Sequence, residues 1–171
     1  MDKDYFEVLG KYNKGANSKM NEVIKGLAEA DWDKQFDGFF KSIHELCSHI
    51  FIGDYVSVRR FKSLKNFKSL TDEYFSKEYD FRETMFKSIG EYVQMRAELD
   101  DIIAAFLSEM AAEDVNKIVT WNGPNGKTNE KRLGICLLSL FNHGTHHRGT
   151  ISAYLDMLGK DNDYSNLAQY G

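Results

Sequence analysis

Residues 141–149 read Phe-Asn-His-Gly-Thr-His-His-Arg-Gly, and they lie in a stretch from about Asn129 to Leu158 whose apolar residues recur at helical spacing. An α-helix turns about 100° per residue, so side chains four positions apart project in similar directions. By this rotation His147 lies within the apolar stripe, His143 lies at its edge, and His146 lies well outside it. The pattern predicts a helix on which two imidazoles face the interior and can converge on one ion.

Three further stretches carry apolar residues at intervals of three and four, which is typical of helices with one buried face. They run over about Tyr5–Ala30, Asp37–Phe61 and Phe81–Ala112. The single proline, Pro124, interrupts none of the four stretches. We therefore expect an all-α fold, a four-helix bundle, in which residues 1–171 form one domain.

Two connections differ from short helix–helix turns. The second and third helices are joined by residues 62–80, a connection of about twenty residues that is long for a simple turn. Before the fourth helix, the apolar run of residues 117–121 is followed by Asn-Gly twice, a pattern that favours a hairpin. We expect a short hairpin-like insertion there, and we expect Gly159 to cap the end of the fourth helix.

The composition is that of a globular protein, with 42% hydrophobic residues and a formal net charge of −4. The pI of about 5.7 argues against a nucleic-acid partner, which requires a basic surface. No apolar run approaches the ~20 residues of a membrane span, and the N-terminus lacks the pattern of a signal peptide. Cys47 and Cys136 lack metal-type spacing and are interpreted as small hydrophobic residues in a reducing compartment, which predicts a cytoplasmic protein.

The second predicted helix carries two more histidines, His44 and His49. Helical rotation places His49 within a broad apolar arc and turns His44 away from it. Gly53 follows His49 by one turn on nearly the same face, so it leaves room beside the imidazole. That room has two interpretations, space for a ligand or close packing of helices, and the sequence leaves both open.

Buried imidazoles require either a hydrogen bond or a metal ion. Spacing alone does not choose between these two states for three inward-facing histidines. Residues 144–146 contain no carboxylate, which excludes the His-Glu-x-x-His pattern of zinc proteases. The Glu-x-x-His pairs of di-iron carboxylate bundles are also absent.

Residues 141–149 resemble the late-helix signature of the DinB/YfiT-like family, whose usual form is Asn-His-x-x-His-His-Arg-Gly-Gln. Residues 42–54, in which His49 follows a Ser-Ile start by seven positions, resemble the second-helix pattern of the family. Residues 12–17 resemble its first-helix pattern, Tyr-Asn-x-Trp-Ala-Asn. The three segments occur in the expected order and together span nearly the whole chain.

The resemblance implies a four-helix bundle, often a homodimer, with a metal site formed by His49, His143 and His147. Three protein ligands leave an open coordination place for water or a substrate. Zinc, nickel and iron are all compatible with three imidazoles. Family members with a known activity are transferases or isomerases that use low-molecular-weight bacterial thiols. The resemblance therefore implies a metal-dependent S-transferase acting on a thiol and an electrophile.

Two positions depart from the family pattern. The glutamine that follows Arg-Gly is Thr150 here, and we expect Thr150, like Gly53, to face the surroundings of the metal or the substrate. The tryptophan of the first helix is Gly15, which either opens space or weakens that helix. We expect Arg148 to pair with an acid such as Asp54 rather than to act in chemistry.

Three hypotheses for function follow. In the first, the metal lowers the pKa of a small thiol and neither cysteine of the chain is the nucleophile. In the second, the chain is a stress-induced, non-catalytic module for metal binding or protein interaction. In the third, the histidines form hydrogen bonds and no metal binds. An open channel to the site favours the enzyme, whereas a site sealed by aromatic residues favours the module.

Overall fold

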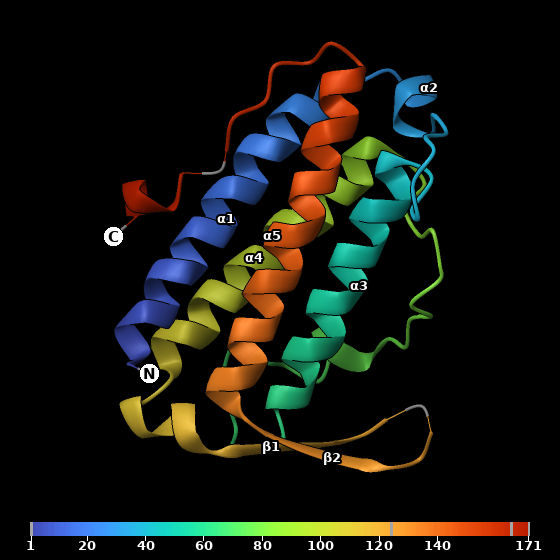
Figure 1. Ribbon diagram of the computed structural model, residues 1–171. Helices are drawn as coiled ribbons and strands as arrows, with labels where there is room; N and C mark the ends of the chain where they lie inside the picture. The colour runs from blue at the N-terminus through green and yellow to red at the C-terminus, as the bar shows by residue number, and fades with distance from the viewer. Residues whose placement is uncertain (1, 124, 165, 171) are drawn as a thin grey trace.

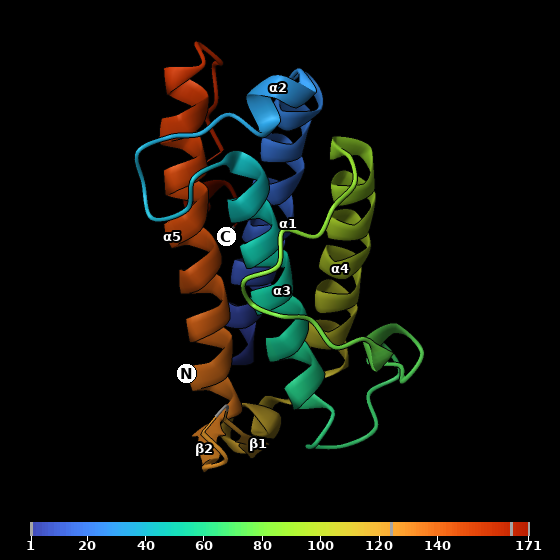
Figure 2. The same cartoon turned by 90° about the vertical axis from the view of Figure 1, so that its right-hand side faces the viewer.

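The computed structural model describes residues 2–123, 125–164 and 166–170, and within these the chain is mostly helical (Figure 1). Four long helices lie side by side: α1 (Lys3–Lys25), α3 (Ile43–Phe61), α4 (Ile89–Glu109) and α5 (Leu133–Met157). α1 packs along α4 and α3 packs along α5, while α5 also contacts α1 and α3 also contacts α4. The two perpendicular views agree on this arrangement (Figures 1 and 2). The prediction of four long helices in this order is confirmed.

The hairpin is also present, so the description all-α is replaced by a mostly helical fold with a small sheet. Strands β1 (Ile118–Asn122) and β2 (Thr128–Arg132) pair antiparallel, with Ile118 opposite Arg132. Because residues 128–132 belong to this strand, the fourth long helix begins at Leu133 and not at Asn129. It ends close to the predicted cap, since Gly159 has a φ of +67° and donates its N–H to Asp156.

Two helices begin later than their apolar spacing predicts, because a serine caps each of them. α3 begins at Ile43 and not at Asp37, since the Ser42 hydroxyl accepts a hydrogen bond from the N–H of Glu45. α4 begins at Ile89 and not at Phe81, since Ser88 accepts from the N–H of Glu91 in the same way. These Ser-x-x-Glu patterns are helix-start signals that the periodicity argument missed.

The first predicted helix is divided into two. α1 ends at Lys25, where Gly26 donates its backbone N–H to Val23, and the four-residue α2 (Glu29–Trp32) follows it. The long connection between α3 and α4, residues 62–88, includes the short 3₁₀ helix η1 (Tyr74–Ser76). It packs four buried side chains onto the core: Phe67, Leu70, Phe75 and Phe86. Two more 3₁₀ turns complete the chain, η2 (Ala112–Asn116) before β1 and η3 (Leu167–Tyr170) near the C-terminus.

None of the helices in the described residues combines the length and the hydropathy that crossing a membrane would require.

Candidate metal centre

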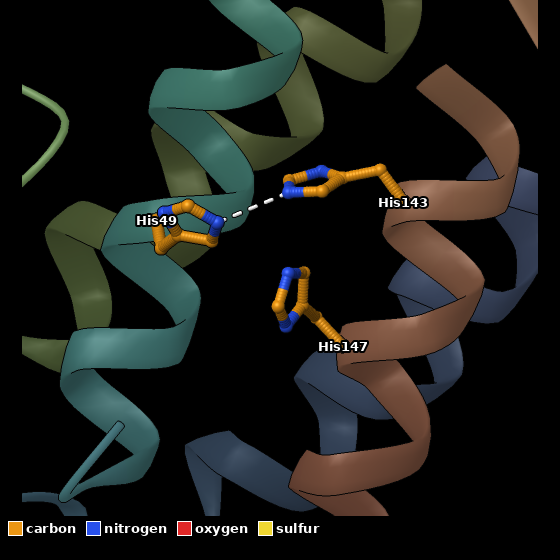
Figure 3. A group of neighbouring side chains, drawn as sticks. All are labelled: His49, His143 and His147. Carbon is orange, nitrogen blue, oxygen red and sulfur yellow. Dashed lines mark hydrogen bonds between the residues drawn. The ribbon is translucent and has the colours of Figure 1, made fainter. Parts of the chain in front are cut away.

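Three histidines from two helices converge between α3 and α5 (Figure 3). His49 projects from α3, and His143 and His147 project from successive turns of α5. One ring nitrogen from each lies within 4.8 Å of the others, and the Nε2 atoms of His49 and His143 are 3.0 Å apart. Imidazole nitrogens that share a tetrahedral ion at about 2.0–2.1 Å lie about 3.4 Å from each other. Small side-chain rotations would therefore close this group on one ion.

The other two histidines lie outside the group, as helical rotation predicts. His146 is exposed, although its ring centroid is 4.8 Å from that of His147. His44 stacks on Trp32 at a centroid distance of 4.9 Å, and its Nδ1 lies 2.8 Å from a carboxylate oxygen of Asp33. Of the five histidines, the structure thus brings together the three that the sequence selects.

The hydrogen bonds at the site distinguish between the two states that the sequence leaves open. The Nε2 atoms of His49 and His143 contact each other, Nδ1 of His49 is buried without a hydrogen-bond partner among the described residues, and the His147 ring lines a cavity. A shared cation would bind one nitrogen of each of the three rings, whereas the hydrogen bond joins only His49 and His143, so the donor set fits a metal ion.

The site also keeps its imidazoles neutral. Burial lowers the pKa of His147 to about 4, and the neighbouring rings of His143 and His49 lower it further in the same direction. The pKa values of His49 and His143 are likewise lowered, in both cases mainly by burial. Since metal ions bind the neutral ring, all three are in the binding-competent form at pH 7.

These pKa shifts predict how the stability of the metal-free protein depends on pH. His147 titrates at about 4 in the folded chain and near 6.5 when unfolded, so between these values the unfolded state binds more protons. We therefore expect the melting temperature in chelator to fall as the pH is lowered from about 6.5 to about 4. His147→Asn should show a shallower fall, while the opposite shift of Asp100 is common to both proteins. Identical pH profiles for the two proteins would contradict this expectation.

Gly53 makes room for a site histidine rather than for a ligand. A Cβ at this position would lie 2.9 Å from Cε1 of His143 and 3.4 Å from its Nδ1. The structure therefore supports close helix packing, one of the two interpretations of Gly53, and the close neighbour is the His143 ring.

Gly53→Ala is expected to displace the His143 ring and to weaken metal binding by about tenfold or more, as changes around metal ligands commonly do. Gly149→Ala on α5 is the matched control, because a Cβ there has no neighbouring atom within 4 Å. Zinc titration of both variants by calorimetry checks this. Equal zinc affinities of the two variants would show that the His143 ring moves aside without weakening metal binding.

The histidines open onto a pocket beside Phe40. The Phe40 ring packs at a tilt against His49 at 4.5 Å and lies edge-on to His147 at 5.3 Å, both measured between ring centroids. On one side is a cavity of about 480 Å³ that all three histidines and Thr150 line. On the other is a cavity of about 440 Å³ that reaches His49. Helical rotation does not reveal Phe40 as a site residue, because Phe40 lies in the loop between α2 and α3.

Arg148 does not pair with Asp54, so that prediction is wrong. Its guanidinium donates to the side-chain oxygens of Asn13 and Asn17 on α1, and Arg96 of α4 takes Asp54 instead, at 2.8 Å. Arg96 also contacts Asp100 at 2.8 Å, and Asn17 donates to the same carboxylate. A continuous buried polar network thus joins all four long helices, and it reaches the residue next to Gly53. Arg148 therefore has a structural role, as expected, but its partners are the side-chain amides of Asn13 and Asn17 and not a carboxylate.

Gly15, which stands where the family pattern has a tryptophan in the first helix, does not leave an empty space. The Tyr170 ring from η3 occupies the position that a side chain at residue 15 would take. Tyr170 also packs edge-on against Tyr12, at a centroid distance of 5.8 Å. An aromatic ring from the C-terminal segment therefore covers this position in place of a tryptophan from the helix itself.

Comparison with known proteins identifies the family of the chain. The family model described as "DinB family" matches residues 1–170. The chain is 27% identical over 156 residues to Protein DinB of Bacillus subtilis (strain 168), a match that covers 91% of this chain and 87% of that protein. No solved structure matches the chain. A match over practically its full length shows that the chain belongs to the DinB family.

Proposed function

We propose that this single-domain protein binds a divalent cation through His49, His143 and His147, and that it transfers a low-molecular-weight thiol to an electrophile. The observation that carries the proposal is the convergence of three neutral imidazoles at an open cavity that all three line. Three protein ligands leave a coordination place free, which is the arrangement of catalytic zinc sites. Zinc, nickel and iron are compatible with the donor set.

The residues around the histidines suit a small substrate pair. A divalent cation would supply Lewis acidity, which lowers the pKa of a thiol that reaches it. Phe39, Phe40 and Tyr154 form an aromatic wall for an apolar electrophile, and the Tyr154 hydroxyl fixes the loop by donating to the carbonyl of Phe40. Thr150 offers a hydroxyl, and His146 offers an exposed imidazole that can accept the thiol proton.

A second candidate is a non-catalytic, stress-induced metal-binding or interaction module. The tilted packing of Phe40 against His49 and its edge contact with His147 favour it, because these contacts cover part of the group. The cavities on both sides of Phe40 favour the enzyme instead. We give the enzyme precedence because all three histidines line the larger cavity.

We also propose that the chain forms a homodimer, as the family resemblance implies, through the outer face of α5. Between Ile135 and Ala153 the exposed residues of this helix include no lysine, arginine, aspartate or glutamate. Leu138 and Ile135 are among the exposed large apolar side chains. An uncharged helix face with small and apolar residues suits contact with a second copy.

The experiment combines metal loading with a thiol screen. Untagged protein is loaded with zinc, nickel or iron and incubated with 1-chloro-2,4-dinitrobenzene and each of several bacterial thiols. We expect conjugation above the uncatalysed rate that requires the metal and is lost in His147→Asn. If the metal binds but no thiol is turned over, the result supports the non-catalytic metal-binding module and contradicts the transferase. If no metal binds, the proposal as a whole is wrong.

A further inference from the structure

The C-terminal end of α3, the β1–β2 hairpin and the start of α5 lie together away from the histidines (Figure 1), and a third cavity lies among their side chains. It has a volume of about 260 Å³. Cys136 in its wall precedes His143 by two helical turns, which is about 10 Å along α5. The cavity is therefore separate from the candidate metal centre, and nothing in the proposed function uses it.

The charged side chains of this cavity all have the same sign. Arg60 of α3 and Lys131 of β2 line it, and no acidic residue does. Across the described residues, neither Arg60 nor Lys131 forms an ion pair or a side-chain hydrogen bond. The neighbouring Arg59, by contrast, holds the Glu78 carboxylate with two hydrogen bonds, at 2.6 and 2.9 Å. Two cations thus face one cavity without a counterion.

Arg60 is partly buried, so its missing partner has an energetic consequence. Burial lowers the pKa of Arg60, and the adjacent charge of Arg59 lowers it further. A partly desolvated guanidinium is stabilised most by an anion that can accept two of its N–H groups. The Trp121 ring, whose centroid lies 4.9 Å from the guanidinium carbon, holds Arg60 in place but does not neutralise it.

The rest of the cavity is aromatic and apolar. Trp121, Phe61 and Val119 form one side, and Ile135 of α5 forms part of the other. Ser57 and Ser139 add two hydroxyl groups. The volume is below the range of about 300–1,000 Å³ that is usual for drug-sized ligands, so an occupant has one or two rings.

We propose that this cavity binds a small organic anion with a flat apolar body, such as an aromatic carboxylate. The carboxylate contacts Arg60 and Lys131, and the ring lies among Trp121, Phe61 and Ile135. Binding of this kind requires both parts of the ligand, since the cations supply the charge complement and the apolar walls supply the burial.

The test uses 1-naphthoate as the probe and 1-naphthamide as its uncharged counterpart, titrated into the full chain by calorimetry. We expect saturable binding of naphthoate and at least tenfold weaker binding of naphthamide. Arg60→Gln should weaken naphthoate binding tenfold or more, and Lys131→Gln should weaken it in the same direction. Arg59→Gln, the matched control from the same helix turn, should stay within about twofold of the parent.

Cys136 reports where the probe binds, because it lines the cavity while Cys47 is fully buried. Saturating naphthoate should slow the alkylation of Cys136 by iodoacetamide, followed by intact mass. The proposal is overturned if naphthoate does not bind saturably, if naphthamide binds equally well, or if Arg60→Gln and Arg59→Gln bind alike. An alkylation rate that naphthoate leaves unchanged also overturns it, because the ligand then lies elsewhere.

Discussion

His143→Asn is expected to lower the affinity for zinc or nickel by more than about 100-fold, since losing a ligand should exceed the 10–100-fold effect of changes around ligands. The Nε2 atom of His143 lies 3.0 Å from that of His49, and the ring packs against Gly53. Calorimetric titration of chelator-treated protein measures the effect. His146→Asn, an exposed position on the same helix, is the control and should leave metal affinity within about twofold.

Stability separates metal binding from a purely hydrogen-bonded cluster in the same variant. If the histidines form a metal site, the metal-free His143→Asn protein should melt at or above the temperature of the metal-free parent. The variant has one partly buried imidazole fewer in the crowded group. If the histidines serve only as hydrogen-bond partners, the variant loses stability and neither protein takes up metal. That combination of results would contradict the metal centre.

Arg96→Met is expected to destabilise the fold by about 3–5 kcal/mol, because it leaves two buried carboxylates without their cation. Arg96 is almost fully buried and binds both Asp54 and Asp100. Burial alone would lower the pKa of Arg96, but the two carboxylates hold it above its ordinary value. Burial raises the pKa of Asp100 to about 6, although Arg96 holds it down. Urea unfolding monitored by circular dichroism measures the loss.

A control for the Arg96 prediction is Lys14→Met, which removes an exposed ion pair with Asp101 between the same two helices, α1 and α4. Such exposed pairs contribute less than about 1 kcal/mol. Replacing Asp54 and Asp100 by asparagine in the Arg96→Met background should restore part of the stability, because it removes the unpaired charges. A loss for Arg96→Met no larger than for Lys14→Met would show that the network does not stabilise the fold.

The number and order of the long helices could be predicted from apolar spacing, but two of their starting points could not. Phe39 and Phe40 before α3, and Phe81 and Met85 before α4, extend the apolar pattern beyond the helices themselves. These aromatic and apolar side chains belong to loops, where tertiary packing decides their positions. The serine caps at Ser42 and Ser88 are the local signal that periodicity cannot supply.

The convergence of the three histidines could be predicted because rotation on a helix fixes direction. The partner of Arg148 could not, because direction does not decide which of several buried polar groups an arginine reaches. Asp54 is already bound by Arg96 of α4. Arg148 donates hydrogen bonds instead to the side-chain amides of Asn13 and Asn17 on α1. The same limit explains why Phe40, a loop residue over the histidines, has no counterpart in the sequence prediction.

The metal content of the protein tests the account most directly. The chain is expressed without a histidine tag, purified without chelator, and analysed for zinc, nickel and iron by elemental mass spectrometry, beside a variant with His143 and His147 both replaced by alanine. We predict about one divalent cation per chain in the parent and none above background in the variant. A folded parent that carries no metal and takes none up from added zinc, nickel or iron would contradict the account.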